Sequence, residues 1–131
     1  MLKSTTIAMS SLLAFQIVVS GCTTSDKGLT ESGYKLLSRD EIRATLAGNT
    51  LSGGQGRAVF VSADGQLRSS NSKQGRWTVT DENQWCDEWP NAPKATDCDH
   101  IYLRGNEVVF VNIDGSKSNK GTIVPGNSRG L

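Results

Sequence analysis

The stretch GRWTVTDENQWCDEW, residues 75–89, decides the fold class of this 131-residue chain. In its first part, polar residues alternate with Trp77 and Val79, which is the period of a β-strand with one buried face. The polar residues 81–83 interrupt this pattern, and a second strand-like segment, residues 84–89, follows them. The stretch therefore predicts two strands joined by a tight turn.

Further strand-like segments flank this hairpin on both sides. They are residues 57–62 and 66–69 around the turn Ala63-Asp64-Gly65, residues 100–104 and 107–112 around Gly105-Asn106, and residues 122–124 before Pro125. Asp-Gly between two such segments is a strong hairpin signal. Because strands at this spacing are typical of an antiparallel meander, we predict a mainly β fold curled into a barrel or half-barrel.

One short α-helix is predicted before these strands. Ser38 and Glu41 have the spacing of a capping box, in which each side chain binds a backbone N–H of the other residue. Leu37 and Ile42 stand at the positions of a hydrophobic staple, and Gly48 suits the end of the helix. Because so short a helix is not stable alone, we expect it to pack on the sheet, over an open end or one face.

The first residues have the features of a secretory signal peptide. Lys3 is the only charge before an apolar stretch, residues 7–19, which is shorter than the ~20 residues of a membrane span. The stretch ends in Val19-Ser20-Gly21-Cys22, which resembles the lipobox of bacterial lipoproteins. The resemblance implies that residues 1–21 are removed and that the Cys22 thiol is acylated, with palmitate among the chains. The alternatives are an ordinary secretory signal followed by an unrelated cysteine, or a buried helix.

Bacterial lipoproteins carry two or three acyl chains, so the resemblance implies stable membrane anchoring through Cys22. Thr23 follows the cysteine, at the position where enteric lipoproteins retained in the inner membrane have aspartate. We therefore expect the protein at the outer membrane, on its periplasmic face.

Removal of residues 1–21 leaves 110 residues, the size of one domain. Residues 22–33 are polar and small, so we expect a flexible tether there and a single β-rich domain over residues 34–131. Since Lys3 is lost, 13 basic side chains face 13 acidic ones. This balance gives no electrostatic reason to bind nucleic acid.

Two further cysteines, Cys86 and Cys98, remain in an oxidising compartment, and we predict a disulfide between them. A metal site is the alternative, but His100 is the only nearby histidine and structural zinc takes four ligands. A redox couple would have C-x-x-C spacing, which this pair lacks. We expect no metal and no cofactor.

Candidate catalytic residues are few. His100 is the only histidine and no G-x-S-x-G motif occurs, so we assign no catalytic residue. Carboxylates gather around the cysteines, at Asp81, Glu82, Asp87, Glu88, Asp97 and Asp99. They could bind calcium or act as an acid/base pair, but the spacing of a calcium-binding loop is missing. We favour solvated loop charges.

The three tryptophans divide into core and surface candidates. Trp77 is expected in the core because it alternates with polar neighbours. Trp85 and Trp89 share one face of their strand and flank Cys86. They either pack against the disulfide, or Trp89 forms an aromatic platform in the loop 88–93. The candidate binding surface consists of Glu88, Trp89 and Asn91.

The order of landmarks resembles a family of small exported proteobacterial domains of unknown function. The landmarks are Glu41-Ile42-Arg43, Gly48-Asn49-Thr50-Leu51-Ser52-Gly53, the Asp64-Gly65 hairpin, Gly75-Arg76-Trp77-Thr78-Val79, and Trp85-Cys86 with a second cysteine. Gly75-Arg76-Trp77 is also similar to the lipocalin signature, which opens the barrel near the N-terminus in lipocalins. Here the motif lies in mid-domain and the chain is short for eight strands, so we do not expect a ligand-filled barrel.

Three classes of function follow. We favour a lipid-anchored, non-catalytic binding module that presents the cysteine loop to an envelope protein or a cell-wall glycan. The second class is an inhibitor of a periplasmic or invading hydrolase, by analogy with other small disulfide-bonded lipoproteins. The third is an envelope enzyme, which the missing catalytic set disfavours.

Overall fold

The computed structural model describes residues 26–90 and 97–131. The elements in chain order are α1 (Asp26–Glu31), β1 (Lys35–Leu36), α2 (Arg39–Leu46), β2 (Thr50–Ser52), β3 (Ala58–Val61), β4 (Gln66–Ser69), β5 (Gln74–Val79), β6 (Trp85–Glu88), β7 (Asp97–Arg104), β8 (Glu107–Asn112) and β9 (Ser118–Val124). The predicted signal peptide, residues 1–21, and Cys22 lie outside the described residues. Within the described ranges, no helix is long and apolar enough to cross a bilayer.

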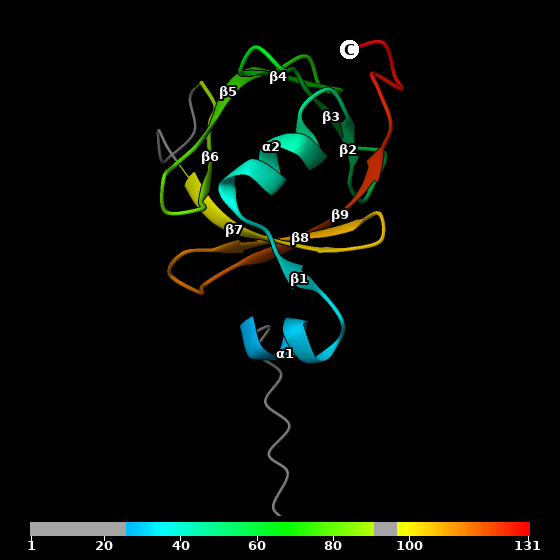
Figure 1. Ribbon diagram of the computed structural model, residues 1–131. Coiled ribbons are helices and arrows are strands. Elements are labelled where there is room, and N and C mark those ends of the chain that lie inside the picture. The colour runs from blue at the N-terminus through cyan, green and yellow to red at the C-terminus, as the bar shows by residue number, and fades with distance from the viewer. Residues whose placement is uncertain (1–25, 91–96) are drawn as a thin grey trace, which may run out of the picture.

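The strands β2 to β9 form a closed antiparallel barrel. Each strand pairs with the next along the chain, and β9 returns to pair with β2 (Figure 1). The short β1 adds to one end of β7, beside the barrel wall. The predicted mainly β meander is thus confirmed, and of the two predicted forms the barrel is the one observed.

Although the sequence is short for eight strands, β2 to β9 form an eight-stranded barrel. The strands are short, from the three residues of β2 to the eight of β7. At this strand length a closed barrel needs few residues, and tight turns connect most of its strands. Residues 50–52 and 118–121 were missed as strands because they lack a long apolar alternation.

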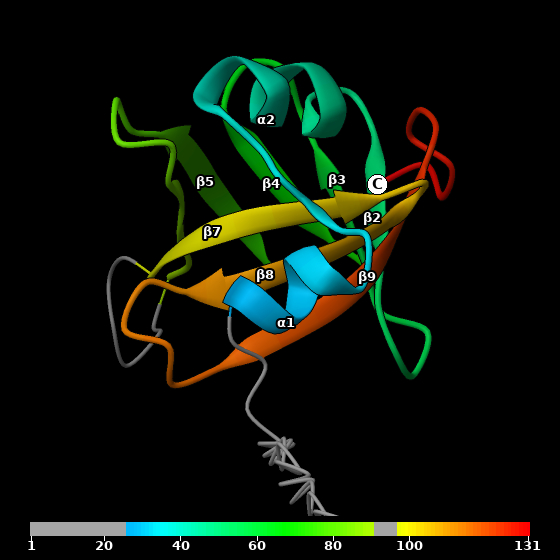
Figure 2. The same cartoon turned by 60° about the horizontal axis from the view of Figure 1, so that its bottom comes forward.

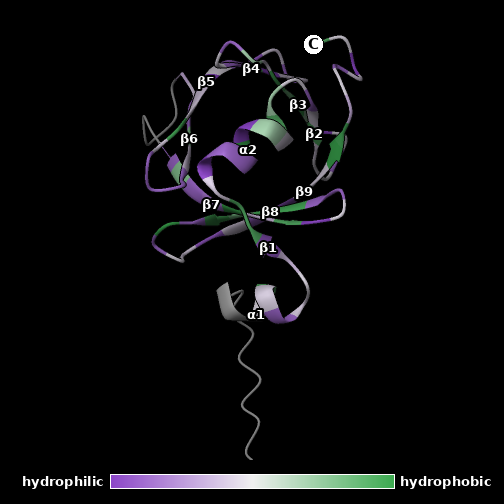
Figure 3. Ribbon diagram, in the orientation of Figure 1, coloured by the Kyte–Doolittle hydropathy of each residue, from purple (hydrophilic) through white to green (hydrophobic). Residues whose placement is uncertain are grey.

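The helix α2 covers one end of the barrel and fills it (Figures 1 and 2). Ile42 and Leu46 on its inner side are fully buried, one turn apart. They meet inward-pointing strand residues in one hydrophobic core: Val61, Leu67, Trp77, Val79, Trp85, Ile101 and Val108. In Figure 3 hydrophobic residues are concentrated on strands such as β8, and the turns at the barrel rims are mostly hydrophilic. Side chains therefore fill the interior.

The predicted start of α2 is confirmed. The Glu41 backbone N–H donates to Ser38 Oγ at 3.4 Å, and the Ser38 N–H donates to Glu41 Oε1 at 3.3 Å. Leu37 and Ile42 are both buried, as the hydrophobic staple requires. Gly48 has φ +80°, the left-handed conformation predicted just beyond the helix.

We predict that Ser38→Ala lowers the free energy of unfolding by about 1 kcal/mol, because the Glu41 N–H loses its acceptor at the helix start. Urea denaturation of the two proteins measures the difference. Ser116→Ala is the matched control, since Ser116 lies exposed in the β8–β9 turn, and it should leave the midpoint unchanged. An unchanged midpoint for Ser38→Ala would contradict a stabilising cap.

A second helix differs from the predicted tether at residues 22–33. Asp26–Glu31 forms α1, which lies on the outer face of β7 and β8 (Figure 2). Its Leu29 and the following Tyr34 are buried in a cluster with three outward-pointing strand residues, Tyr102, Val109 and Val111. Residues 26–33 therefore belong to the folded domain, and residues 22–25 of the predicted tether lie outside the described residues.

Candidate functional site

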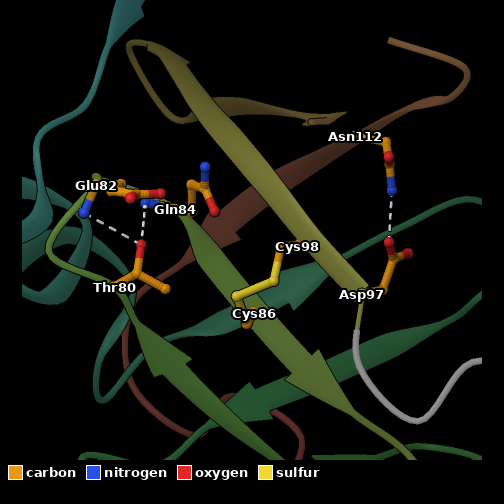
Figure 4. The surroundings of a disulfide bond; sticks show 7 residues. All are labelled: Thr80, Glu82, Gln84, Cys86, Asp97, Cys98 and Asn112. Atoms are coloured by element: carbon orange, nitrogen blue, oxygen red, sulfur yellow. Dashed lines mark hydrogen bonds between the residues drawn. A yellow bond between two sulfur atoms is a disulfide. The ribbon is translucent and has the colours of Figure 1, made fainter. Parts of the chain in front are cut away.

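Glu88 and Trp89 of the candidate binding surface lie where β6 ends, beside the start of β7 and at the barrel end away from α2 (Figure 2). Cys86 and Cys98 are directly opposite each other in this strand pair, and their disulfide is formed, as predicted. The bond ties the two strands at the base of the connecting segment (Figure 4). Asn91 lies in residues 91–96, outside the described residues.

The tryptophans lie on the opposite face of β6 from the disulfide. Trp85 points into the barrel, where its ring stacks on Trp77 with centroids 5.0 Å apart. Because side chains alternate along a strand, Cys86 points outward. Trp85 is therefore a core residue, and its packing partner is Trp77.

Trp89 is partly buried and packs against the core. A Cβ added to Gly75 would lie 2.8 Å from Cε3 of the indole, so the ring occupies the space that Gly75 leaves open. The indole N–H donates to Asp87 Oδ2 at 2.9 Å. Both the face and the polar edge of Trp89 thus contact the barrel, whereas Glu88 beside it is exposed.

Three of the six carboxylates highlighted by the sequence come together at this end. Oxygens of Asp87, Asp97 and Asp99 all lie within 4.8 Å of one another. The register pairs Asp87 with Asp97 and Trp85 with Asp99, which places the three on the inner face. For Asp87 and Asp99, which are half-buried, the expectation of solvated loop charges was wrong.

The other three carboxylates, Asp81, Glu82 and Glu88, are exposed as expected. Asp81 forms an ion pair with Arg39 near the start of α2. These three carboxylates are therefore not part of the cluster of Asp87, Asp97 and Asp99.

Burial and the charges of neighbouring carboxylates raise the pKa of the two half-buried members, Asp87 and Asp99. Burial, followed by the charges of Asp97, Asp87 and Asp114, raises the pKa of Asp99 to about 7. Burial also raises the pKa of Asp87, against the opposing effect of the Trp89 N–H. The Asn112 amide donates to Asp97 Oδ1 (Figure 4).

We predict a stability that falls as the pH rises toward 7. Folded Asp99 keeps a proton that the unfolded chain, with a carboxyl pKa of 3.8, has already released. The stabilisation from Asp99 is complete below the pKa of the unfolded chain and is lost as the pH rises through the pKa of the folded protein. Between about pH 5 and pH 8 the loss is on the order of 1–2 kcal/mol, reduced by the partial exposure of the side chain.

Asp99→Asn should flatten this dependence and raise the melting temperature at about pH 8. Glu82→Gln, an exposed carboxylate changed in the same way, is the control and should keep the slope. Thermal melts over the pH range measure both. A slope that persists in Asp99→Asn would contradict the assignment.

The carboxylates of Asp87, Asp97 and Asp99 can share a proton or contribute oxygen ligands to a hard cation. Calcium takes six to eight oxygens, of which three carboxylates supply only a part. These side chains come from two strands, which is why no linear calcium motif marks them. Neighbouring carboxyl groups with raised pKa values, such as Asp87 and Asp99, also have the electrostatic features of acid/base residues.

An outward groove lies beside this group, on the outer wall of β4, β5 and β6. Its volume is about 480 Å³, and its lining residues are Gln66, Gln74, Gly75, Arg76, Glu88 and Pro90. The register places Gln66, Arg76 and Glu88 side by side across three strands. The groove thus combines amide, guanidinium and carboxylate groups at the edge of the disulfide-closed segment.

His100 lies on β7 opposite Val111, whose side chain packs on the outer face. In the predicted binding surface, Glu88 lines the groove, whereas the Trp89 ring faces the core. The sequence analysis missed the groove and the cluster of Asp87, Asp97 and Asp99, because both depend on the register between strands.

No protein-family model, curated protein or solved structure matches this chain.

Proposed function

We propose that the chain is a lipid-anchored protein of the bacterial outer membrane whose barrel binds a partner without catalysing a reaction. The anchor is the diacylated Cys22, and the barrel is the rigid support of a binding surface. The groove of β4–β6 is the observation that carries the binding role. It presents four polar side chains on regular strands, next to a segment closed by a disulfide.

The composition of the groove favours a polar partner. Arg76 and Glu88 are exposed and can form charge-assisted hydrogen bonds, and the amides of Gln66 and Gln74 supply both donors and acceptors. Such groups suit the hydroxyls and amides of a cell-wall glycan or the backbone of an envelope protein. Because strands hold these side chains, little ordering is required when a partner binds.

The test uses the mature chain with Cys22→Ala, exported by a signal without a lipobox. It is offered separately to purified peptidoglycan and to an envelope protein extract. We expect saturable retention by one of them, which Arg76→Ala and Glu88→Ala each weaken by about tenfold, equal to ~1.4 kcal/mol. Arg57→Ala and Glu82→Ala, exposed residues of the same types elsewhere, are the matched controls.

Retention that is insensitive to the groove variants would place the contact elsewhere on the molecule. Stoichiometric capture of a hydrolase, with loss of its activity, would support the inhibitor alternative. Turnover of an envelope substrate would support the enzyme instead.

A further inference from the structure

One face of the barrel consists of α1, Leu36 and the β8–β9 turn, and we call it the α1 face. The described part of the chain begins on this face, where Leu29 of α1 is buried in a cluster with Val109 and Val111. Tyr34 fixes the exit from α1, since its hydroxyl donates to Glu107 Oε2 at 2.9 Å. The chain therefore enters the domain over β8 (Figure 2).

The distance from this entry point to Cys22 is short. Four residue steps separate Cys22 from Asp26, and a fully extended chain covers at most about 14 Å in that number. This is about half of the ~30 Å hydrocarbon thickness of a bilayer. An acyl chain on Cys22 would thus hold the start of α1 close to the membrane surface.

The α1 face also carries the two exposed large hydrophobic side chains of the described residues. Leu36 is 49% exposed and Ile113 is 51% exposed. Leu36 pairs with Tyr102, whose side chain points outward beneath α1, so both share the outer face. Ile113 follows β8 directly, two residues after Val111, which lies in the outer cluster with Leu29 of α1.

Basic side chains lie beside these apolar groups. Lys117 is exposed in the β8–β9 turn, and Lys120 is exposed on β9 opposite Val109, hence on the outer face. Glu107 on the same face is paired with Arg104 at 2.8 Å. Apolar side chains flanked by lysines suit the boundary between acyl chains and anionic headgroups.

We propose that the α1 face lies on the lipid bilayer, with Leu36 and Ile113 at the acyl boundary and Lys117 and Lys120 toward anionic headgroups. This inference rests on the proposed anchoring of Cys22. In this orientation β4, which lies across the barrel from β8, faces away from the membrane (Figure 1). The β4–β6 groove is then open to the periplasm.

The experiment uses the full acylated protein, reconstituted in vesicles of phosphatidylethanolamine and phosphatidylglycerol. Ser116→Cys in the β8–β9 turn carries an environment-sensitive fluorophore, and Gln66→Cys on β4 carries the same probe as the control. Both positions are exposed, so the probes should not disturb the core. Lipids with a spin label on the acyl chain serve as the quencher, and the intact mass of each protein reports its acylation.

We expect several-fold stronger quenching at position 116 than at position 66. An acylated protein with equal or reversed quenching would overturn the orientation while leaving the anchor in place. A change at position 116 that follows protein concentration instead of lipid would show a second copy on this face, and would also overturn it. A mature chain without acyl mass would refute the anchor, and the orientation with it.

Discussion

Trp77→Ala should lower the free energy of unfolding by about 3–5 kcal/mol, a large share of the ~5–15 kcal/mol typical of a domain. The Trp77 side chain is almost completely buried and stacks on Trp85 with an interplanar angle of 11°. Its indole N–H donates to the Ser62 carbonyl at 2.8 Å, so removal leaves a cavity and takes away one of the two donors to that oxygen, which also accepts from the Gly65 N–H. Urea denaturation of the mature chain measures the loss.

Trp89→Ala is the matched comparison, because it removes the same side chain from a partly buried position. We expect a smaller loss of about 1–2 kcal/mol, from the contact with Gly75 and the hydrogen bond to Asp87. A loss as large as that of Trp77→Ala would make Trp89 a full core residue. A loss below about 1 kcal/mol for Trp77→Ala would contradict the stacked interior.

Removal of the disulfide should have the second large effect on stability. Cys86 and Cys98 close a segment with a sequence separation of 12, for which chain entropy predicts about 3 kcal/mol. Reduction by a thiol and the double variant Cys86→Ala/Cys98→Ala should lower the free energy of unfolding by similar amounts. Denaturation with and without reductant measures the difference.

The double variant controls for side effects of the reductant. It should show no further loss when thiol is added, whereas the parent chain should. Intact mass under non-reducing conditions should show the parent chain two hydrogens lighter than its reduced form. Two free thiols in the untreated protein, or a denaturation midpoint independent of reductant, would contradict a stabilising bond.

The parts of the fold with strong local signals were predictable from the sequence. The capping box of Ser38 and Glu41 marks α2 because its two hydrogen bonds lie within four residues. The Asp64-Gly65 hairpin and the alternation around Trp77 likewise depend on neighbours in the chain. Closure of the barrel depends instead on pairing of Thr50–Ser52 with residues 122–124, which no local pattern encodes.

The features that the sequence analysis missed depend likewise on contacts between residues distant in the chain. Leu29 is the only large apolar residue of α1, so its burial is decided by the surface of β7 and β8 and not by helical periodicity. Asp97 and Asp99 lie on the inner face of β7 although their side chains are acidic, which reverses the usual pattern of a strand. Their proximity to Asp87 follows from the β6–β7 register, and that register became visible only in the folded chain.

The proposed function depends on a lipid at Cys22, and the intact mass of the mature protein shows whether that lipid is present. The protein is expressed in a Gram-negative host, extracted from membranes and measured alongside Cys22→Ser. We predict a parent chain that begins at Cys22 and carries the mass of diacylglycerol with an N-acyl group, while the variant gains no acyl mass. A parent chain with an unmodified Cys22, or one cleaved at another position and released in soluble form, would contradict the claim.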